Sequence, residues 1–264
     1  MPGVEVRETT GPDGVETVRR AARTRSDSSQ FYDLAEYYDP INDWKDYRGE
    51  TRRLEAIVAR FGRPKSTTWL DVACGTGRHL EFLGETYSTV GVDRSRKMLR
   101  IARQRLPGVR LIQGDMRTFR LQERFDVVSC LFSAIGHLTT EEDVRTTFAN
   151  FARHLNPGGV AIVEPWIDPS AFRPGLFHLR THQDPTLTVV RLSSSSRRGN
   201  RSIIHYHFLI AEPGRDIRQV QVTDIGLLLS RDRLLALMRQ AGLKARFFAR
   251  GLMPGRGLLV GVKP

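Results

Sequence analysis

The 264-residue sequence contains only two cysteines, Cys74 and Cys130, and neither has the spacing of a metal site or of a disulfide framework. So few cysteines are typical of a reducing compartment, and we expect a cytoplasmic protein. No apolar run approaches the ~20 residues that a membrane-spanning helix needs, and no apolar stretch follows the first arginines. We therefore expect neither a membrane anchor nor a secretory signal, and the length fits one large domain or one domain with an insertion.

Acidic residues are in the minority, with 29 against 41 lysines and arginines, which gives a formal net charge of +12. Nearly all of the basic residues are arginines that are scattered along the chain, and no aromatic pattern for base stacking lies between them. The densest cluster, residues 191–201, is interrupted by four serines. An ordinary arginine-rich surface and the attraction of an anionic small substrate both fit this charge, whereas nucleic acid is disfavoured.

A glycine turn stands at the centre of the sequence. Residues 67–72 form a short run rich in apolar and β-branched residues, Gly75 and Gly77 follow, and a helical pattern comes next. This order predicts the strand, tight turn and helix with which a doubly wound sheet begins its ligand crevice. The two glycines lack a Cβ, so we expect a ligand to lie against the backbone here. Leu80 occupies the place of the third glycine of the dinucleotide fingerprint, which argues against a pyrophosphate in this turn.

Two carboxylates follow the next two predicted strands. The strand over 88–92 ends at Asp93, whose side chain can accept hydrogen bonds from both hydroxyls of a ribose. The strand over 109–113 ends in Gly114-Asp115-Met116, where Asp115 can accept from an adenine amino group while Met116 lies on the ring. The sequence therefore predicts an adenosine-like ligand at the carboxyl edge of the sheet.

The fourth predicted strand, 125–132, leads to His137, the histidine that the strand order places in the crevice. His137 is a candidate catalytic residue, and the alternative is a structural histidine that caps the next helix. A fifth strand over 160–164 brings Trp166 to the same edge.

From residue 168 the alternation of strand and helix stops, and three consecutive segments joined by turns show strand patterns. They predict an inserted antiparallel meander that forms one wall of the crevice. Its histidines lack a third ligand at a metal-site spacing, so we expect no metal. The three segments are Thr186–Ser195, Arg201–Ala211 and Ile217–Asp224.

Six aromatic residues fall between Phe31 and Tyr47. We predict a helix from Ser28 to Tyr38 that is broken at Pro40, and a second helix from about Asp46 to Phe61. The aromatic segment either caps the sheet or closes over the cofactor as a lid. The predicted segments are a disordered or loosely attached arm (1–28), an aromatic helical lid (29–62), an α/β core (63–167 and 225–264) and the β insertion (168–224).

Taken in order, the motifs L-D-V-A-C-G-T-G, G-V-D, G-D-M and F-D-V-V-S resemble the class I methyltransferases that use S-adenosylmethionine, over roughly residues 66–165. Further segments resemble the subgroup that methylates amino groups of nucleotide-linked deoxysugars in antibiotic pathways. These segments are Tyr38-Asp39 with Lys45-Asp46-Tyr47, Q-G-D-M-R-x-F-R-L, F-S-x-I-G-H-L, L-x-P-G-G-V, E-P-W, Y-H-F and G-R-G-L-x-V-G-V.

The resemblance implies an α/β fold with a doubly wound, Rossmann-like methyltransferase sheet and an inserted antiparallel β meander. It implies S-adenosylmethionine as cofactor, a small-molecule acceptor such as a nucleoside diphosphate sugar, and a homodimer as one option for assembly. The expected catalytic residues are His137 and Tyr38, and the expected acceptor contacts are Trp166, His207 and Arg256, with Arg256 on the diphosphate. The expected cofactor contacts are Tyr47, Asp71, Ala73, Gly75, Gly77, Asp93, Met98, Asp115, Met116 and Leu131.

Methyl transfer from a sulfonium is an in-line displacement. Holding donor and acceptor in line therefore supplies most of the rate enhancement, and it lowers the activation barrier by ~7–11 kcal/mol in ideal intramolecular models. We expect His137 either to accept a proton from the amine or to orient the nitrogen. The alternatives are methylation of another small N or O acceptor, methylation of RNA, or a non-catalytic cofactor-binding protein.

Overall fold

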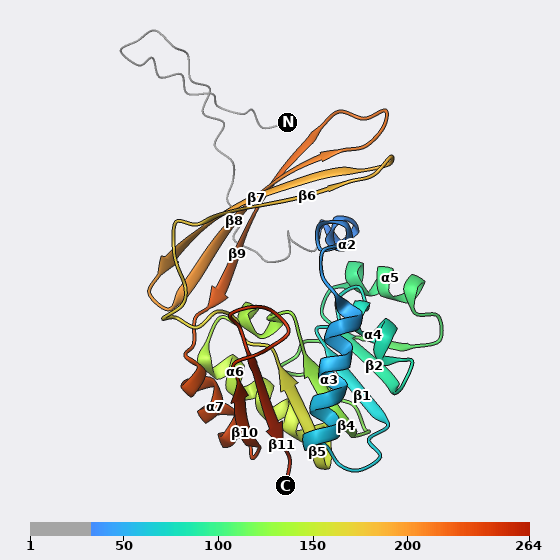
Figure 1. Ribbon diagram of the computed structural model, residues 1–264, viewed down its shortest axis with the longest axis vertical. Coiled ribbons are helices and arrows are strands. Elements are labelled where there is room, and N and C mark those ends of the chain that lie inside the picture. The colour runs from blue at the N-terminus through green and yellow to red at the C-terminus, as the bar shows by residue number, and fades with distance from the viewer. Residues whose placement is uncertain (1–32) are drawn as a thin grey trace, which may run out of the picture.

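The computed structural model describes residues 33–264, and its larger part is a seven-stranded sheet with the order β10-β11-β5-β4-β1-β2-β3 (Figure 1). All neighbours are parallel except β11, which runs antiparallel to both β5 and β10. The strand order reverses between β1 and β4, so a crevice is expected at the carboxyl ends of these two strands. The strands are β1 (Thr68–Val72), β2 (Ser88–Asp93), β3 (Arg110–Gln113), β4 (Phe125–Cys130), β5 (Leu155–Val163), β10 (Lys244–Phe248) and β11 (Leu258–Val262).

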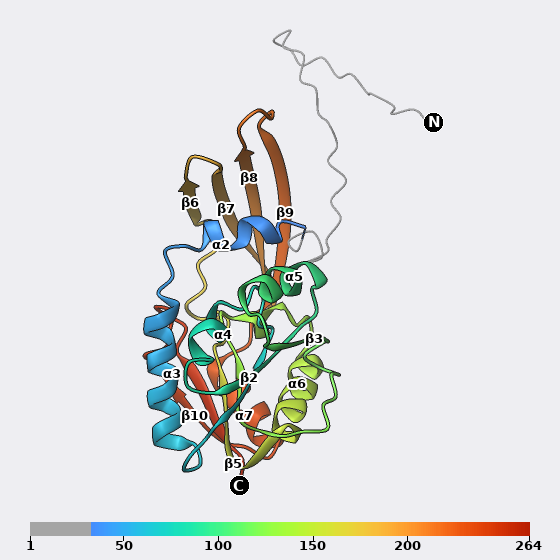
Figure 2. The same ribbon diagram turned by 90° about the vertical axis from the view of Figure 1, so that its right-hand side faces the viewer.

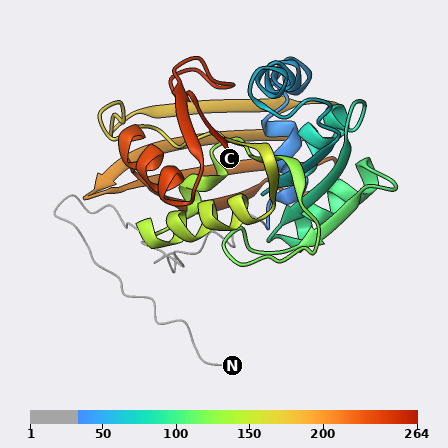
Figure 3. The same cartoon turned by 90° about the horizontal axis from the view of Figure 1, so that it is seen from below.

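Helices cover both faces of this sheet, which explains why the central strands β1 and β4 are buried along their length rather than on alternate residues. Trp69 of β1 packs in one cluster with Leu54 of α3, whereas the next residue, Leu70, packs in another with Phe148 of α6. Figure 3 shows α3 on one side of the sheet and α6 with α7 on the other. The helices are α3 (Tyr47–Phe61), α4 (Arg78–Leu83), α5 (Arg96–Arg105), α6 (Glu141–Arg153) and α7 (Arg231–Gln240). None of the helices in residues 33–264 is long and apolar enough to cross a bilayer.

The predicted start of the helix near Asp46 is confirmed at its cap, where the side chain of Asp46 accepts from the amide of Gly49. In the same way α5 begins after Ser95, whose side chain accepts from the amide of Met98. The helix break expected at Pro40 is wrong, because Pro40 lies inside the first turn of α2 (Tyr38–Ile41), where proline is tolerated. The expected helix start at Ser28 and the arm 1–28 lie outside the described residues.

The inserted segment forms a separate four-stranded antiparallel sheet with the order β6-β7-β8-β9. The three strands predicted here are confirmed, with β9 continuing past residue 224, and β6 is an additional strand that was not predicted. Figures 1 and 2 show this sheet above the carboxyl ends of the core strands. The strands are β6 (Phe177–Gln183), β7 (Thr188–Arg198), β8 (Arg201–Ala211) and β9 (Arg218–Leu227).

The short helices η1 (Ala35–Tyr37) and α2 pack against the inserted sheet. Leu34, Tyr37 and Ile41 share a buried cluster with Val189 and Phe208 of that sheet. Figure 2 shows α2 between the inserted sheet and α5 of the core. The aromatic segment therefore bridges the two sheets at the level where the core strands end.

Candidate cofactor and acceptor site

Three cavities adjoin at the carboxyl ends of β1, β2 and β4. We call them the adenosine cavity (about 260 Å³), the tail cavity (about 30 Å³) and the acceptor cavity (about 440 Å³). Ala73 lines both the adenosine and the tail cavities, and Tyr38 and Phe132 line both the tail and the acceptor cavities. His137 lines both the adenosine and the acceptor cavities. The predicted catalytic residues Tyr38 and His137 thus lie where a nucleoside, its tail and an acceptor would meet.

The two glycines of the turn have different roles. Gly75 has a φ of +57°, lines the tail cavity, and an added Cβ would meet nothing within 4 Å, so its backbone faces open space. Gly77 has a φ of +80°, and an added Cβ would stand 2.6 Å from a methyl group of Leu106. Gly77 lies outside the residues that line the three cavities, and it is required for packing against the end of α5.

Asp93 lines the adenosine cavity and is 5% exposed. One carboxylate oxygen accepts from the amide of Gly75 at 2.8 Å and the other from the amide of Ser95 at 2.7 Å. Each oxygen therefore keeps a lone pair for a ribose hydroxyl. Burial raises the pKa of Asp93, although both amides oppose that shift. The two backbone bonds fix the carboxylate in one orientation before any ligand arrives.

Asp115 and Met116 also line the adenosine cavity, as predicted. Asp115 is held by Arg117, whose Nε and Nη2 donate to its two oxygens at 2.9 and 2.7 Å, and the hydrogen bonds from Arg117 lower the pKa of Asp115. Arg117 also donates to Asp143 of α6 at 2.8 Å. The expected hydrogen bond from an adenine amino group must then use a lone pair of Asp115 that Arg117 leaves open. The sequence alone did not predict this role of Arg117.

The tail cavity offers one acidic and one basic side chain. Burial raises the pKa of Asp71 to about 7, and its carboxyl accepts from the hydroxyl of Ser129 at 2.6 Å. Arg78 lies over the ring of Tyr47 at 5.0 Å, and Leu131 lines the same cavity. A carboxylate and a guanidinium are the partners that the ammonium and carboxylate of an amino acid need. The charged side chains that line the tail cavity thus suit the methionine part of S-adenosylmethionine, and the carboxylates of the adenosine cavity suit its nucleoside.

Polar contacts at Asp39 and at Glu50 tie the segment 34–50 to the core. Asp39 accepts from the hydroxyl of Thr76 at 2.6 Å and from Nη2 of Arg105 at 2.6 Å, so α2 is fastened to the glycine turn and to α5. Lys45, whose side chain is fully buried, pairs with Glu50, and Glu50 contacts His79 of α4 at 2.7 Å. None of these contacts was predicted. The segment also packs on the inserted sheet through Leu34, Tyr37 and Ile41, while Tyr38 and Tyr47 line the tail cavity.

The chain turns sharply after β4. Phe132 and Ser133 have φ values of +51° and +59°, a conformation that costs a non-glycine residue about 1–3 kcal/mol. Glu164 accepts from the amide of Phe132 at 2.7 Å, and the hydroxyl of Ser133 donates to the carbonyl of Pro165 at 2.6 Å. This turn places η2 (Ala134–His137) at the junction of the cavities. Nδ1 of His137 then lies 3.1 Å from a carboxylate oxygen of Asp224 on β9, and Asp224 raises the pKa of His137.

The acceptor cavity has a basic wall. Arg256 lies 4.9 Å above the ring of Trp166 and donates to the hydroxyl of Ser133 at 2.8 Å, so two predicted acceptor residues line this cavity together. Arg191 of β7 lies 5.4 Å over the ring of Tyr206, and Arg180 of β6 stands directly opposite Arg191 in the strand register.

Arg191 is the unusual member of that wall. Its Nε is buried, and no hydrogen-bond partner for it is found among residues 33–264. Burial lowers the pKa of its guanidinium. From sequence, Arg191 was grouped with the surface cluster 191–201, and the structure separates it from that cluster.

Besides Gly77, two predicted contacts lie away from the cavities. His207 is opposite Leu192 in the register of β7 and β8, and both side chains are exposed, whereas the neighbouring Tyr206 lines the acceptor cavity. Met98 is 3% exposed, its amide bonds the cap of α5, and it lies outside the lining of all three cavities.

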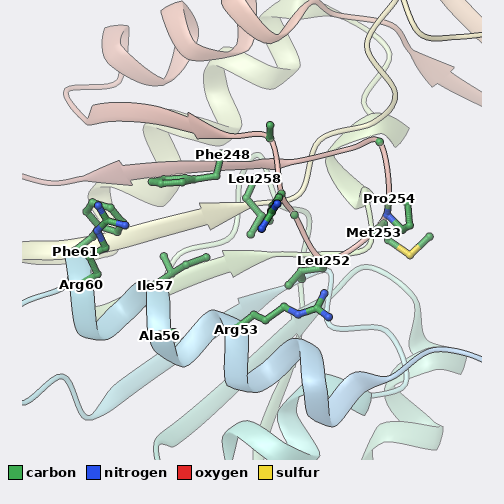
Figure 4. A pocket seen from close by; sticks show the side chains of 14 residues that line it. Arg53, Ala56, Ile57, Arg60, Phe61, Phe248, Leu252, Met253, Pro254 and Leu258 are labelled. Atoms are coloured by element: carbon green, nitrogen blue, oxygen red, sulfur yellow. The ribbon is translucent and has the colours of Figure 1, made fainter.

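A larger groove of about 740 Å³ runs between α3 and the turn that joins β10 to β11 (Figure 4). Its lining is mostly apolar, with Ile57 and Phe61 from α3 and Phe248 and Leu258 from the two strands. It contains none of the predicted site residues. Met253 and Pro254 line both this groove and the acceptor cavity, so one turn separates the two spaces.

Comparison with known proteins agrees with this geometry. Residues 70–159 match the family model described as a methyltransferase domain. The chain is 41% identical over 233 residues to the dTDP-3-amino-3,6-dideoxy-alpha-D-glucopyranose N,N-dimethyltransferase of Streptomyces fradiae, covering 87% of this chain and 91% of that protein. It is 40% identical to the dTDP-3-amino-3,4,6-trideoxy-alpha-D-glucopyranose N,N-dimethyltransferase of Streptomyces venezuelae, covering 89% and 98%.

Solved structures give the same picture. The crystal structure of Streptomyces venezuelae DesVI is similar with a TM-score of 0.81 and 38% identity, covering 91% of this chain and all (100%) of that chain. SAM-bound CalS10, an amino pentose methyltransferase from Micromonospora echinaspora involved in calicheamicin biosynthesis, is similar with a TM-score of 0.75 and 32% identity, covering 93% and 100%. The predicted doubly wound α/β fold with its β insertion is confirmed.

Proposed function

The chain belongs to the S-adenosylmethionine-dependent amino-sugar N-methyltransferases, and from this premise we propose that its acceptor is a deoxysugar amine linked to a nucleoside diphosphate. The methyl group is transferred to the sugar nitrogen, once or twice. The pathway that uses the product builds a glycosylated natural product such as an antibiotic, and the reaction takes place in the cytoplasm.

The observation that carries the diphosphate is the half-buried Arg191, whose Nε is buried and has no hydrogen-bond partner among the described residues. A buried N–H without an acceptor is destabilising, and like charges directly opposite each other on neighbouring strands add to this, as Arg180 and Arg191 do. Such an arrangement is expected where a ligand supplies the missing anion. Arg256, in the same cavity, presents a second guanidinium to that anion. Arg191 with Arg180 forms one group of guanidinium ions and Arg256 forms the other. Two such groups suit the two phosphates of a diphosphate.

The residues of the site act mainly by position. S-adenosylmethionine supplies a methyl group on a sulfonium, which needs no further activation. Asp93 and Asp115 hold the nucleoside from the core, and Asp71 with Arg78 holds the amino-acid tail. Tyr38 and Phe132 border both the tail and the acceptor cavities, so they exclude water from the line of transfer. His137 meets the acceptor from the other side and receives the proton of the amine.

The test is a transfer assay with the purified chain, S-adenosylmethionine and a panel of acceptors. The panel pairs dTDP-linked 3-amino and 4-amino deoxysugars with the same amino sugars lacking the nucleotide, and with RNA. Mass spectrometry should show added methyl groups on a dTDP-linked sugar, with a far lower kcat/KM for the free sugar. Equal kcat/KM for both forms, or transfer only to RNA, would contradict the proposal.

For assembly we propose a homodimer that forms through the outer face of the inserted sheet. Phe177, Leu179, Leu192 and Leu209 are 73%, 59%, 45% and 46% exposed on this sheet. Leu179 and Leu192 are opposite each other in the register, so they form one apolar patch. Sedimentation should give a dimer for the native chain and a monomer for Leu179→Asp with Leu192→Asp. A native monomer would refute the dimer.

A further inference from the structure

The pair formed by His137 and Asp224 joins two parts of the chain that lie far apart in sequence. His137 ends η2 after the strained turn of the core, and Asp224 lies on β9 of the inserted sheet. Nδ1 of His137 is 3.1 Å from a carboxylate oxygen of Asp224. The Asp224 side chain is only 12% exposed, and within residues 33–264 His137 is its ion-pair partner.

Among the described residues, no other charged group around the His137 ring favours its charged form as strongly as the Asp224 carboxylate does. Arg94 and Asp93 face His137 from the end of β2 with opposite effects on it, and burial disfavours its charge. Tyr206 of β8 is the titratable group that approaches Asp224 from the inserted sheet. Asp224 is the largest influence on His137, and it favours the charged form of the ring.

The orientation of the ring follows from this contact. Since Asp224 occupies Nδ1, the neutral imidazole carries its proton on Nδ1 and presents the lone pair of Nε2. The His137 side chain is 42% exposed, and it lines both the adenosine and the acceptor cavities. A methyl donor and an acceptor that fill these cavities would exclude solvent from the exposed part of the His137 ring. Its ion pair with Asp224 would then be stronger.

We propose that Asp224 is a positioning residue that makes His137 the base of the reaction, a role that rests on the proposed function. As the lone pair of the amine forms the new bond to the methyl carbon, the carbon–sulfur bond breaks and its electron pair stays on sulfur. The proton of the amine passes to Nε2 of His137. Asp224 stays ionised, keeps the proton on Nδ1 and stabilises the imidazolium until solvent removes the transferred proton.

A purely structural role is the competing explanation, in which Asp224 only fastens η2 to the inserted sheet. The two roles differ in the pH profile. Asp224 raises the pKa of His137, so the neutral base forms only at a higher pH than for an ordinary histidine. Removing the charge of Asp224 should therefore move the acidic limb of kcat/KM to lower pH, whereas loss of a fastening contact leaves the limb in place.

The kinetic test is Asp224→Asn, with Asp216→Asn in the exposed β8–β9 turn as the matched control. We expect Asp224→Asn to lower kcat by ~10²–10⁴-fold, to shift the acidic limb downward, and to leave the affinity for S-adenosylhomocysteine within a few-fold of native. The control should match the native chain in all three. An unshifted limb, or a kcat within a few-fold of native, overturns the proposal.

A second measurement needs no acceptor and no variant. NMR of the native protein with labelled histidine should show His137 protonated on Nδ1 in its neutral form, with a pKa above its ordinary value. A proton on Nε2, or a pKa at or below the ordinary value, overturns the proposal. If the NMR result holds while no amino sugar is methylated, then the proposed acceptor fails and the histidine–aspartate pair stands.

Discussion

The cofactor half and the acceptor half of the site differ in how their charges are satisfied. In the core, Asp93 accepts from two backbone amides and Asp115 is held by Arg117, so each carboxylate is fixed by the protein itself. In the inserted sheet, Arg191 is half-buried, its Nε is buried and unpartnered within the described residues, and Arg180 stands opposite it. The core is thus preorganised for its ligand, whereas the arginines of the inserted sheet need the negative charge of a bound anion.

This difference implies opposite responses to mutation. Removing a core carboxylate should weaken both the fold and cofactor binding, because backbone donors lose their acceptor. Removing a cavity arginine should weaken acceptor binding while relieving the free protein of an unpaired charge.

Asp93→Ala should give the largest loss of affinity. The variant removes two charge-assisted hydrogen bonds to the ribose, each worth about 1.5–3 kcal/mol, and leaves the amides of Gly75 and Ser95 without an acceptor. Calorimetry should show S-adenosylhomocysteine binding at least ~10²-fold more weakly. Thermal unfolding should also occur at lower temperature. Retention of affinity within a few-fold would mean that Asp93 does not face the nucleoside.

Arg191→Met should raise KM for a dTDP-amino sugar by ~10–100-fold, because a charge-assisted bond to phosphate is lost. The affinity for S-adenosylhomocysteine should not change, and the free variant should unfold at the same or a higher temperature. Arg198→Met is the matched control, since Arg198 lies on the same strand but is exposed and outside the cavity. If both variants behave alike, Arg191 is not an acceptor contact.

Cofactor affinity should depend on pH through Asp71. Burial raises the pKa of Asp71 to about 7, so below that pH its carboxyl is increasingly neutral and cannot pair with the ammonium of the cofactor. The affinity for S-adenosylhomocysteine should therefore fall by up to ~10-fold per pH unit as the pH drops below 7. Asp71→Asn should bind weakly at all of these pH values. A native profile that is flat from about pH 5 to about pH 9, ~2 units on either side of the pKa of Asp71, would exclude this pairing.

The smallest effect is expected at the contact between α2 and the glycine turn. Thr76→Val removes the 2.6 Å hydrogen bond to Asp39, a loss of about 1 kcal/mol, while Arg105 still holds the carboxylate. Stopped-flow measurements should show S-adenosylhomocysteine leaving ~5-fold faster. Thr146→Val on α6, which removes a hydrogen bond from a half-buried threonine to Glu142 away from the cavities, serves as control. An unchanged rate would show that this contact does not limit release.

The core half of the site could be predicted from sequence because local patterns determine it. Each core strand is a short apolar run that ends in a turn, and parallel strands end at one edge, so Asp93, Asp115 and His137 are brought together by strand order alone. Sequence could not show that Asp115 is held by Arg117, because either partner of such a short-range ion pair can also face solvent.

The acceptor half could be predicted only in outline. β6 was missed because His178, Arg180 and His182 alternate with few apolar residues, and a polar inward face hides the strand period. His207 and Tyr206 are neighbours on one strand, so a single register decides which of them faces the cavity. Asp224 is 87 residues from His137, and only the packing of the inserted sheet on η2 brings the two together.

The most direct test of the two-part site is a crystal structure with S-adenosylhomocysteine and a dTDP-linked amino sugar bound together. We expect the nucleoside on Asp93 and Asp115, the diphosphate between Arg191 and Arg256, and the amine about 3 Å from Nε2 of His137. A diphosphate bound away from Arg191 and Arg256, or an amine out of reach of His137, would contradict the account.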